Sequence, residues 1–212
     1  MTPGDEERSA QTLTSATDLS RASTPSPRKL RGPGAWWPTL AAIALAAFVA
    51  YDTSSGSELA PILAASGLVY LGAAALRKPR AAWPLFILTF VVISASRIAS
   101  RIGVAGFNPT WVLIGLAVLL LGYGLLNGAA RPTGGLPLQT IAMVAVGAAA
   151  VIALTVGGDV GAYLVAAGLL GHAAWDVYHH RVNRVVARSM AEFCGVLDTL
   201  LSAAIVIAAA RG

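Results

Sequence analysis

The chain has 212 residues, of which 56% are hydrophobic and only 12% are charged, and its mean hydropathy is +0.70. Soluble domains average about 25% charged residues, so this composition excludes a soluble globular protein and indicates a single integral membrane domain. The formal net charge is +5, but the basic residues cluster at the ends of apolar segments, which indicates membrane orientation and no nucleic-acid partner.

Residues 1–35 differ from the rest of the chain because they are polar and rich in Ser, Thr and Pro. Such a segment cannot bury enough apolar area to order itself, so we predict a disordered cytoplasmic tail. It has no apolar stretch typical of a cleavable signal peptide, so the first span must act as the insertion signal. The basic residues at its end serve as a topology signal or, alternatively, contact anionic membrane lipids.

Seven apolar segments follow the tail within residues 36–212, separated by short breaks with turn formers such as Asn108-Pro109 and Gly157-Gly158. About 20 residues cross a hydrocarbon core of about 30 Å as a helix. The segments are too long and too uniformly apolar for barrel strands, so the predicted fold class is all-α: a polytopic membrane bundle of about seven transmembrane helices. The predicted spans are residues 36–51, 59–76, 82–100, 108–127, 137–156, 160–180 and 190–210, of which the first two are short enough to tilt little or draw in flanking residues.

Lys and Arg are distributed unevenly over the two ends of these spans. With the tail in the cytoplasm, Arg97, Arg101 and Arg211 lie outside and all other basic residues lie inside. Because basic residues accumulate in cytoplasmic loops, this pattern predicts an inside amino terminus and an outside carboxyl terminus, in the cell inner (cytoplasmic) membrane. The inside set is Arg8, Arg21, Arg28, Lys29, Arg31, Arg77, Lys78, Arg80, Arg131, Arg181, Arg184 and Arg188.

Ionisable residues gather in the last two spans, where they are costly and therefore indicate function. At 100° per residue, His172, Asp176 and His179 fall within about 80° on the sixth span, and Glu192 and Asp198 lie within an arc of about 120° on the seventh. The two spans are antiparallel and joined by a short turn. Matching their depths predicts that His172 lies near Asp198 and Asp176 near Glu192, at the cytoplasmic end of the pair.

Three functions fit this cluster, and the spacing decides between none of them. The first is a metal-dependent or acid/base enzyme that acts on a lipid or a small apolar metabolite, with a divalent metal such as Zn²⁺ or Fe²⁺. The second is a small proton- or cation-coupled transporter. The third is a structural role, in which interhelical hydrogen bonds hold the helix pair in register. The candidate metal ligands are His172, Asp176, His179 and Glu192, and the candidate catalytic groups are Asp176, Glu192 and Asp198.

Arg97 and Arg101 share one face of the third span near its outer end. We interpret them as snorkelling side chains, with an anion or lipid headgroup contact as the alternative. The single cysteine, Cys194, excludes an intrachain disulfide and is expected to be a small buried apolar group.

Small residues are expected to let the helices approach closely, because no hydrophobic gain drives association between helices in lipid. The residues that we assign to this role are Gly115, Gly122, Gly124, Ala167 and Gly171.

Overall fold

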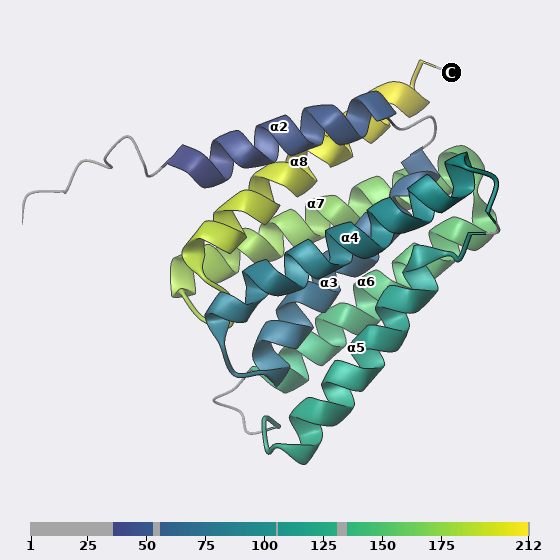
Figure 1. Cartoon of the computed structure of the whole chain (residues 1–212). Helices are drawn as coiled ribbons and strands as arrows, with labels where there is room; N and C mark the ends of the chain where they lie inside the picture. Colours follow the sequence, from purple (N-terminus) through teal and green to yellow (C-terminus); the bar gives the residue numbers. More distant parts are fainter. Residues whose placement is uncertain (1–35, 53–55, 105, 131–134, 212) are drawn as a thin grey trace, which may run out of the picture. The chain divides into compact units, whose positions relative to one another are not determined.

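A computed structural model describes residues 36–52, 56–104, 106–130 and 135–211. The predictions made for the tail and for Arg131 lie outside these residues. The described part is all-α without a β-strand, and two short 3₁₀ turns, η2 (Gly56–Leu59) and η3 (Pro79–Ala81), lead into α3 and α4. Its helices are α2 (Trp37–Asp52), α3 (Ala60–Ala75), α4 (Ala82–Arg101), α5 (Pro109–Leu126), α6 (Leu136–Val156), α7 (Gly158–Val182) and α8 (Arg188–Ala209), as shown in Figure 1.

These helices confirm the predicted all-α membrane bundle. Six of them, counted with their 3₁₀ turns among the described residues, are long and apolar enough to cross a membrane, whereas α2 is a shorter apolar helix. The predicted second span does draw in flanking residues, because η2 and α3 together run from Gly56 to Ala75, which is 20 residues. The chain is therefore a multi-pass membrane protein.

Local sequence explains where several helices begin and end. Asn108 caps α5 by accepting a hydrogen bond from the backbone N–H of Thr110 at 3.0 Å, and Pro109 occupies the first turn, where no N–H is needed. At the other end of α7, Asn183 takes the left-handed conformation (φ 50°) that ends a helix, and its N–H donates to the carbonyl of His179 at 2.8 Å.

Helix α3 lies at the centre of the bundle, and α4, α5, α6 and α7 all pack against it (Figure 1). Every residue of α3 except Ile62 is buried. The outer helices instead expose large apolar side chains, such as Leu119 on α5 at 70% and Ile141 on α6 at 68%. Exposed apolar surface on this scale fits contact with lipid chains, so α3 is the helix most shielded from the membrane.

Helices α7 and α8 form an antiparallel pair with the most extensive packing in the bundle. The hydroxyl of Ser202 on α8 donates to the backbone carbonyl of Ala166 on α7 at 2.9 Å. Gly195 allows close approach, because a Cβ there would lie 3.3 Å from the Cβ of Asp176. On its far side α8 packs against α2, and the bond between Thr39 and Glu192 places the first turns of these two helices together. The α7–α8 contact positions the candidate site.

Candidate functional site

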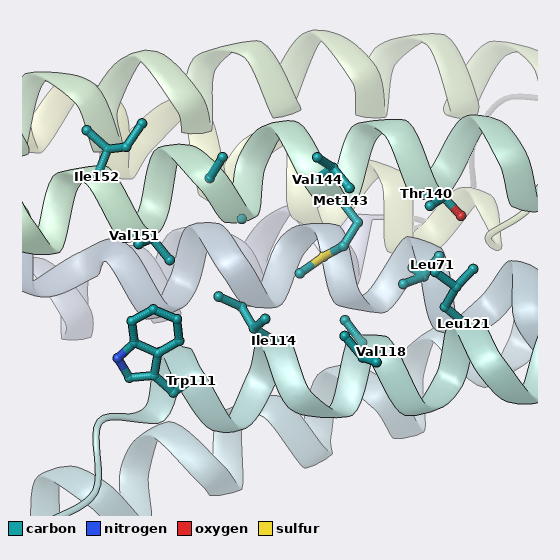
Figure 2. Close-up of a pocket in the computed structure, with 13 residues that line it drawn as sticks. Leu71, Trp111, Ile114, Val118, Leu121, Thr140, Met143, Val144, Val151 and Ile152 are labelled. Atoms are coloured by element: carbon teal, nitrogen blue, oxygen red, sulfur yellow. The ribbon is translucent and has the colours of Figure 1, made fainter.

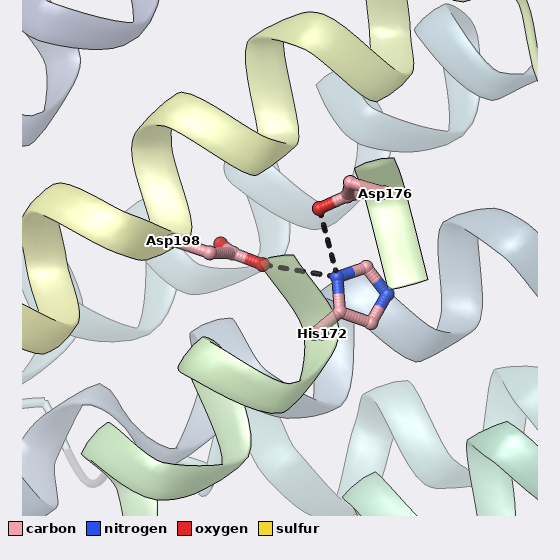
Figure 3. Close-up of side chains that lie close together, drawn as sticks. All are labelled: His172, Asp176 and Asp198. Atoms are coloured by element: carbon pink, nitrogen blue, oxygen red, sulfur yellow. Dashed lines mark hydrogen bonds and ion pairs between the residues drawn. The ribbon is translucent and has the colours of Figure 1, made fainter. Parts of the chain in front are cut away.

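His172 on α7 is the centre of a buried polar group that also contains Asp176, one turn later, and Asp198 on α8 (Figure 3). Its Nδ1 lies 3.0 Å from Oδ2 of Asp198 and 3.3 Å from Oδ2 of Asp176. An ionised carboxylate only accepts hydrogen bonds, so Nδ1 is the protonated nitrogen and faces both acids. The exposed fractions are 3% for His172, 0% for Asp176 and 2% for Asp198. We call these three residues the His172 cluster.

Tyr70 on α3 completes the surroundings of this cluster. Its hydroxyl donates a short hydrogen bond to Oδ1 of Asp176. Its ring meets His172 edge-on, with centroids 5.1 Å apart, and also meets His179, with centroids 4.9 Å apart. The central helix therefore supplies both a hydrogen-bond donor and an aromatic wall to residues of α7.

The cluster lies near the middle of the membrane-spanning helices. His172 is ten residues from the end of α7 at Val182, and Asp198 is ten residues from the start of α8 at Arg188. At about 1.5 Å per residue this depth is roughly 15 Å, half of a hydrocarbon core of about 30 Å. The pair is thus deeper than the cytoplasmic end at which the sequence analysis expected it.

Two buried polar atoms of the His172 cluster have no hydrogen-bond partner in the described part of the chain. They are Nε2 of His172 and Oδ2 of Asp176, the latter held only by its ion pair with Nδ1. Buried polar atoms are normally hydrogen-bonded, so such exceptions mark a place where a proton, an ion or water would be stabilised. The two atoms lie on opposite sides of the imidazole bond to Asp198, so the cluster has unused capacity on both sides.

His179 belongs to a second polar group with Gln139 on α6 and Trp175. The amide nitrogen of Gln139 lies 3.0 Å from Nε2 of His179, and its amide oxygen accepts from the indole N–H of Trp175 at 3.2 Å. On the other side, Nδ1 of His179 lies 3.0 Å from the carbonyl oxygen of Trp175. Because a carbonyl only accepts and the Gln139 amide donates, His179 is neutral with its proton on Nδ1. Both of its nitrogens are satisfied.

Glu192 belongs to a third group at the first turns of α2 and α8. Its Oε1 accepts from the hydroxyl of Thr39 at 2.8 Å, and its Oε2 lies 3.8 Å from Nε2 of His180. Nearby, the indole N–H of Trp83 donates to the hydroxyl of Ser189 at 3.2 Å. This group ties three helices together at one end of the bundle.

The structure thus brings together some of the predicted site residues and separates others. The predicted contact between His172 and Asp198 is confirmed. Asp176 bonds Tyr70 and His172, whereas the carboxylate of Glu192 is turned to Thr39 and His180, in place of the predicted approach of Asp176 to Glu192. His172 and His179 are seven residues apart, about 10 Å along the helix, so one ion cannot bind both. A potential ligand group among the described residues is His172, Asp176 and Asp198, whose ligand atoms all lie within 4.8 Å.

Sequence reasoning missed Tyr70, Gln139 and Thr39. Gln139 and Thr39 come early in their helices, where a polar residue usually faces an interface. Tyr70 was the one available signal, because it lies five residues inside the end of α3, deeper than the belt that tyrosine normally occupies.

A separate hollow of about 400 Å³ lies between α5 and α6 above α3 (Figure 2). Trp111 and Val118 of α5 line one wall, Met143 and Val151 of α6 line the other, and Leu71 of α3 lies beneath. The described residues around it include no titratable side chain, so it contributes apolar surface and no acid/base chemistry.

Comparison of the chain with protein-family models, with curated proteins and with solved structures found no match. The functional argument therefore depends on the geometry of the site.

Proposed function

We propose that the protein is a small proton-coupled membrane transporter in which the His172 cluster binds the transported proton. The main support is one observation: the imidazole of His172 is held between two buried carboxylates about halfway through the bundle. Carboxylates and histidines at this depth are costly in lipid, and they are typical of proton relays and coupling-ion sites.

The charges of the cluster give a reason for proton binding. With a neutral imidazole and two ionised carboxylates, Asp176 and Asp198, the cluster has two negative charges in a low-dielectric environment. One added proton completes an imidazolium, and a second one converts a carboxylate to the acid, which leaves no net charge. Because net charge is penalised away from water, the cluster is stabilised by protons when it is closed.

Other titratable groups face the cluster from the helices packed around it. Tyr70 approaches from α3 and donates to Asp176. Cys194 on α8 and His179 on α7 also interact electrostatically with it. The Tyr70 hydroxyl and the Cys194 thiol are neutral donors, and His179 is held neutral by Gln139, so none of them supplies the positive charge that the two carboxylates lack.

A divalent metal is the main alternative ligand, and the partner of the second imidazole nitrogen disfavours it. An ion bound at Nδ1 of His172 and at the two carboxylates would require the proton to move to Nε2. Metal-bound histidines almost always donate that N–H to a carboxylate, a carbonyl or water. Nε2 of His172 has no such acceptor among the described residues. The enzyme hypothesis has less support, because the hollow between α5 and α6 is lined by none of the three cluster residues.

Infrared difference spectroscopy of the purified protein in lipid vesicles tests proton binding directly. Shifting the pH between about 8 and 5 should produce a buried carboxylic acid band that is absent in Asp198→Asn and changed in His172→Gln. Asp159→Asn is the matched control, since Asp159 is an exposed acid in the first turn of α7. An unchanged carboxyl region, or a stoichiometric metal that copurifies and disappears in His172→Gln, would overturn the proposal.

The same spectra separate a transporter from an enzyme when pH is changed on one side of sealed vesicles at a time. A transporter site must exchange protons with both sides, so either jump should produce the band in oriented protein. A response to one side alone would contradict transport and would support an acid/base site open to a single face of the membrane.

A further inference from the structure

A second candidate site lies at the other end of the bundle, in the seam between α2 and α4. Helix α2 packs chiefly against α8, whereas α4 packs chiefly against α3, so the seam has α3 and α8 as its floor. Near the first turns of α2 and α4 an aromatic group closes it: Trp37 and Trp83 have ring centroids 5.0 Å apart, and Phe193 of α8 contacts Trp83 at 5.4 Å and Phe86 at 4.9 Å.

Beyond this aromatic group the seam contains a narrow apolar hollow of about 80 Å³. Phe48 of α2 and Phe90 of α4 form its sides, and Leu197 and Leu201 of α8 contribute to its floor. It runs along α4 from Phe86 to Arg97, which is eleven residues or about 16 Å at 1.5 Å per residue. This length is close to one leaflet, half of a hydrocarbon core of about 30 Å.

The apolar hollow leads to a wider polar hollow of about 430 Å³ at the last turns of α4. Arg97, Ile62 and Ile93 line both hollows, so the two are continuous. Arg101, Ser100 and Asn108 add polar groups to the wider one, and Glu58 adds a carboxylate. Its lining therefore has two positive charges and one negative charge, a net charge of +1.

We infer that this seam binds an anionic phospholipid, with its phosphate at Arg97 and Arg101 and an acyl chain in the apolar hollow. The two parts match the two ends of such a lipid in charge, depth and length. Guanidinium groups recognise phosphate with two parallel hydrogen bonds, and Glu58 would help to orient them. A free anion would explain the arginines but would leave the adjoining apolar hollow without an occupant, so the continuous shape favours a lipid.

Native mass spectrometry of the intact protein tests this with phosphatidylglycerol and phosphatidylcholine that have identical acyl chains. We expect the wild-type protein to retain more phosphatidylglycerol. Replacing both arginines, Arg97→Gln with Arg101→Gln, should reduce this preference by about fivefold for each charge removed. Arg211→Gln is the matched control, because Arg211 is an exposed arginine just after α8, at the same end of the bundle. Equal retention of the two lipids by the wild-type protein, or an equal effect of Arg211→Gln, would overturn the inference.

Two further measurements keep the result interpretable. Ser94 lines the apolar hollow, so Ser94→Phe should reduce binding of phosphatidylglycerol while both arginines remain. The charge-conserving pair Arg97→Lys and Arg101→Lys should retain most of the preference, which separates loss of charge from misfolding. If inorganic phosphate displaces phosphatidylglycerol and Ser94→Phe has no effect, the seam binds a free anion and the lipid assignment is wrong.

Discussion

The imidazoles of His172 and His179 differ in how their two nitrogens are used, although both are buried on the same face of α7. His179 has one partner at each nitrogen, so its tautomer is fixed. His172 has two carboxylates at Nδ1 and no partner at Nε2 among the described residues. A fully satisfied group favours a single state, whereas a group with one crowded and one unused nitrogen can change its protonation. His179 is thus the structural histidine of the pair.

A double-mutant cycle should detect the contact between His172 and Asp198. His172→Ala and Asp198→Ala should each destabilise the folded bundle, but the combined variant should lose less than the sum, because the second substitution no longer breaks a bond. The coupling should be about 0.6 to 2 kcal/mol, as for other interhelical hydrogen bonds in membranes. Equilibrium unfolding in mixed detergents measures it. Pairing His172→Ala with Thr39→Ala, in a separate polar group, is the control and should be additive.

Gln139 should matter to stability although it is a single uncharged residue. Gln139→Leu removes the donor to Nε2 of His179 and the acceptor for the indole N–H of Trp175, which leaves two buried polar atoms unpaired. We expect a loss of about 1–3 kcal/mol for each such atom, with a change in Trp175 fluorescence. Leu138→Ala changes an exposed side chain one position earlier, and a similar loss there would mean that the hydrogen bonds have no special role.

At the scale of helices, α7 has two glycines with opposite surroundings. A Cβ on Gly161 would lie 2.6 Å from the backbone oxygen of Ala153 on α6, which cannot easily move, whereas a Cβ on Gly171 would meet nothing within 4 Å. Gly161→Ala should therefore destabilise by about 1–3 kcal/mol through overpacking. Gly171→Ala should be neutral or stabilising, because alanine favours helix. Thermal unfolding of both variants compares them within one helix, and equal effects would contradict the packing described.

The same comparison explains what could be predicted from sequence at this scale. Helix positions follow from apolar runs and turn formers, so the predicted spans agree with the helices to within about two residues. Glycine packing depends on which neighbour faces each helix. Gly124 does approach Ala75, with a Cβ contact of 3.0 Å, but Gly115, Gly122 and Gly171 face open space, so their predicted role is wrong. The buried position of Cys194 is confirmed.

The site was predictable where two helices sufficed to define it. His172 and Asp198 lie on adjacent antiparallel helices at equal depth, so their contact followed from face and rise alone. Glu192 is six residues from Asp198, about 120° around α8, which turns its carboxylate toward α2. The partners on α3 and α6 required the arrangement of the whole bundle, which periodicity in one helix does not contain.

At the scale of the whole molecule, α2 decides how many times the chain crosses the membrane. It has 16 residues, about 24 Å, which is shorter than a hydrocarbon core of about 30 Å. However, α2 starts beside the first turn of α8, through the Thr39 to Glu192 bond, and packs along α8, which is long enough to span. A helix that follows a spanning neighbour in parallel should itself cross, with flanking residues completing its length.

Reporter fusions should therefore place the amino terminus on the same side as Arg80 and Arg184, in the cytoplasm, and Ser57 and Gly158 on the opposite side. The physical reason is the positive-inside rule: Arg77, Lys78 and Arg80 lie at one end of the helices with Arg181, Arg184 and Arg188, while three basic residues lie at the other end. If α2 only rests on the surface, the amino-terminal reporter will instead match Ser57 while the fusions after Arg80 and Arg184 stay cytoplasmic. That outcome would reduce the bundle to six spans, and a fusion after Arg184 that reports the exterior would contradict the orientation itself.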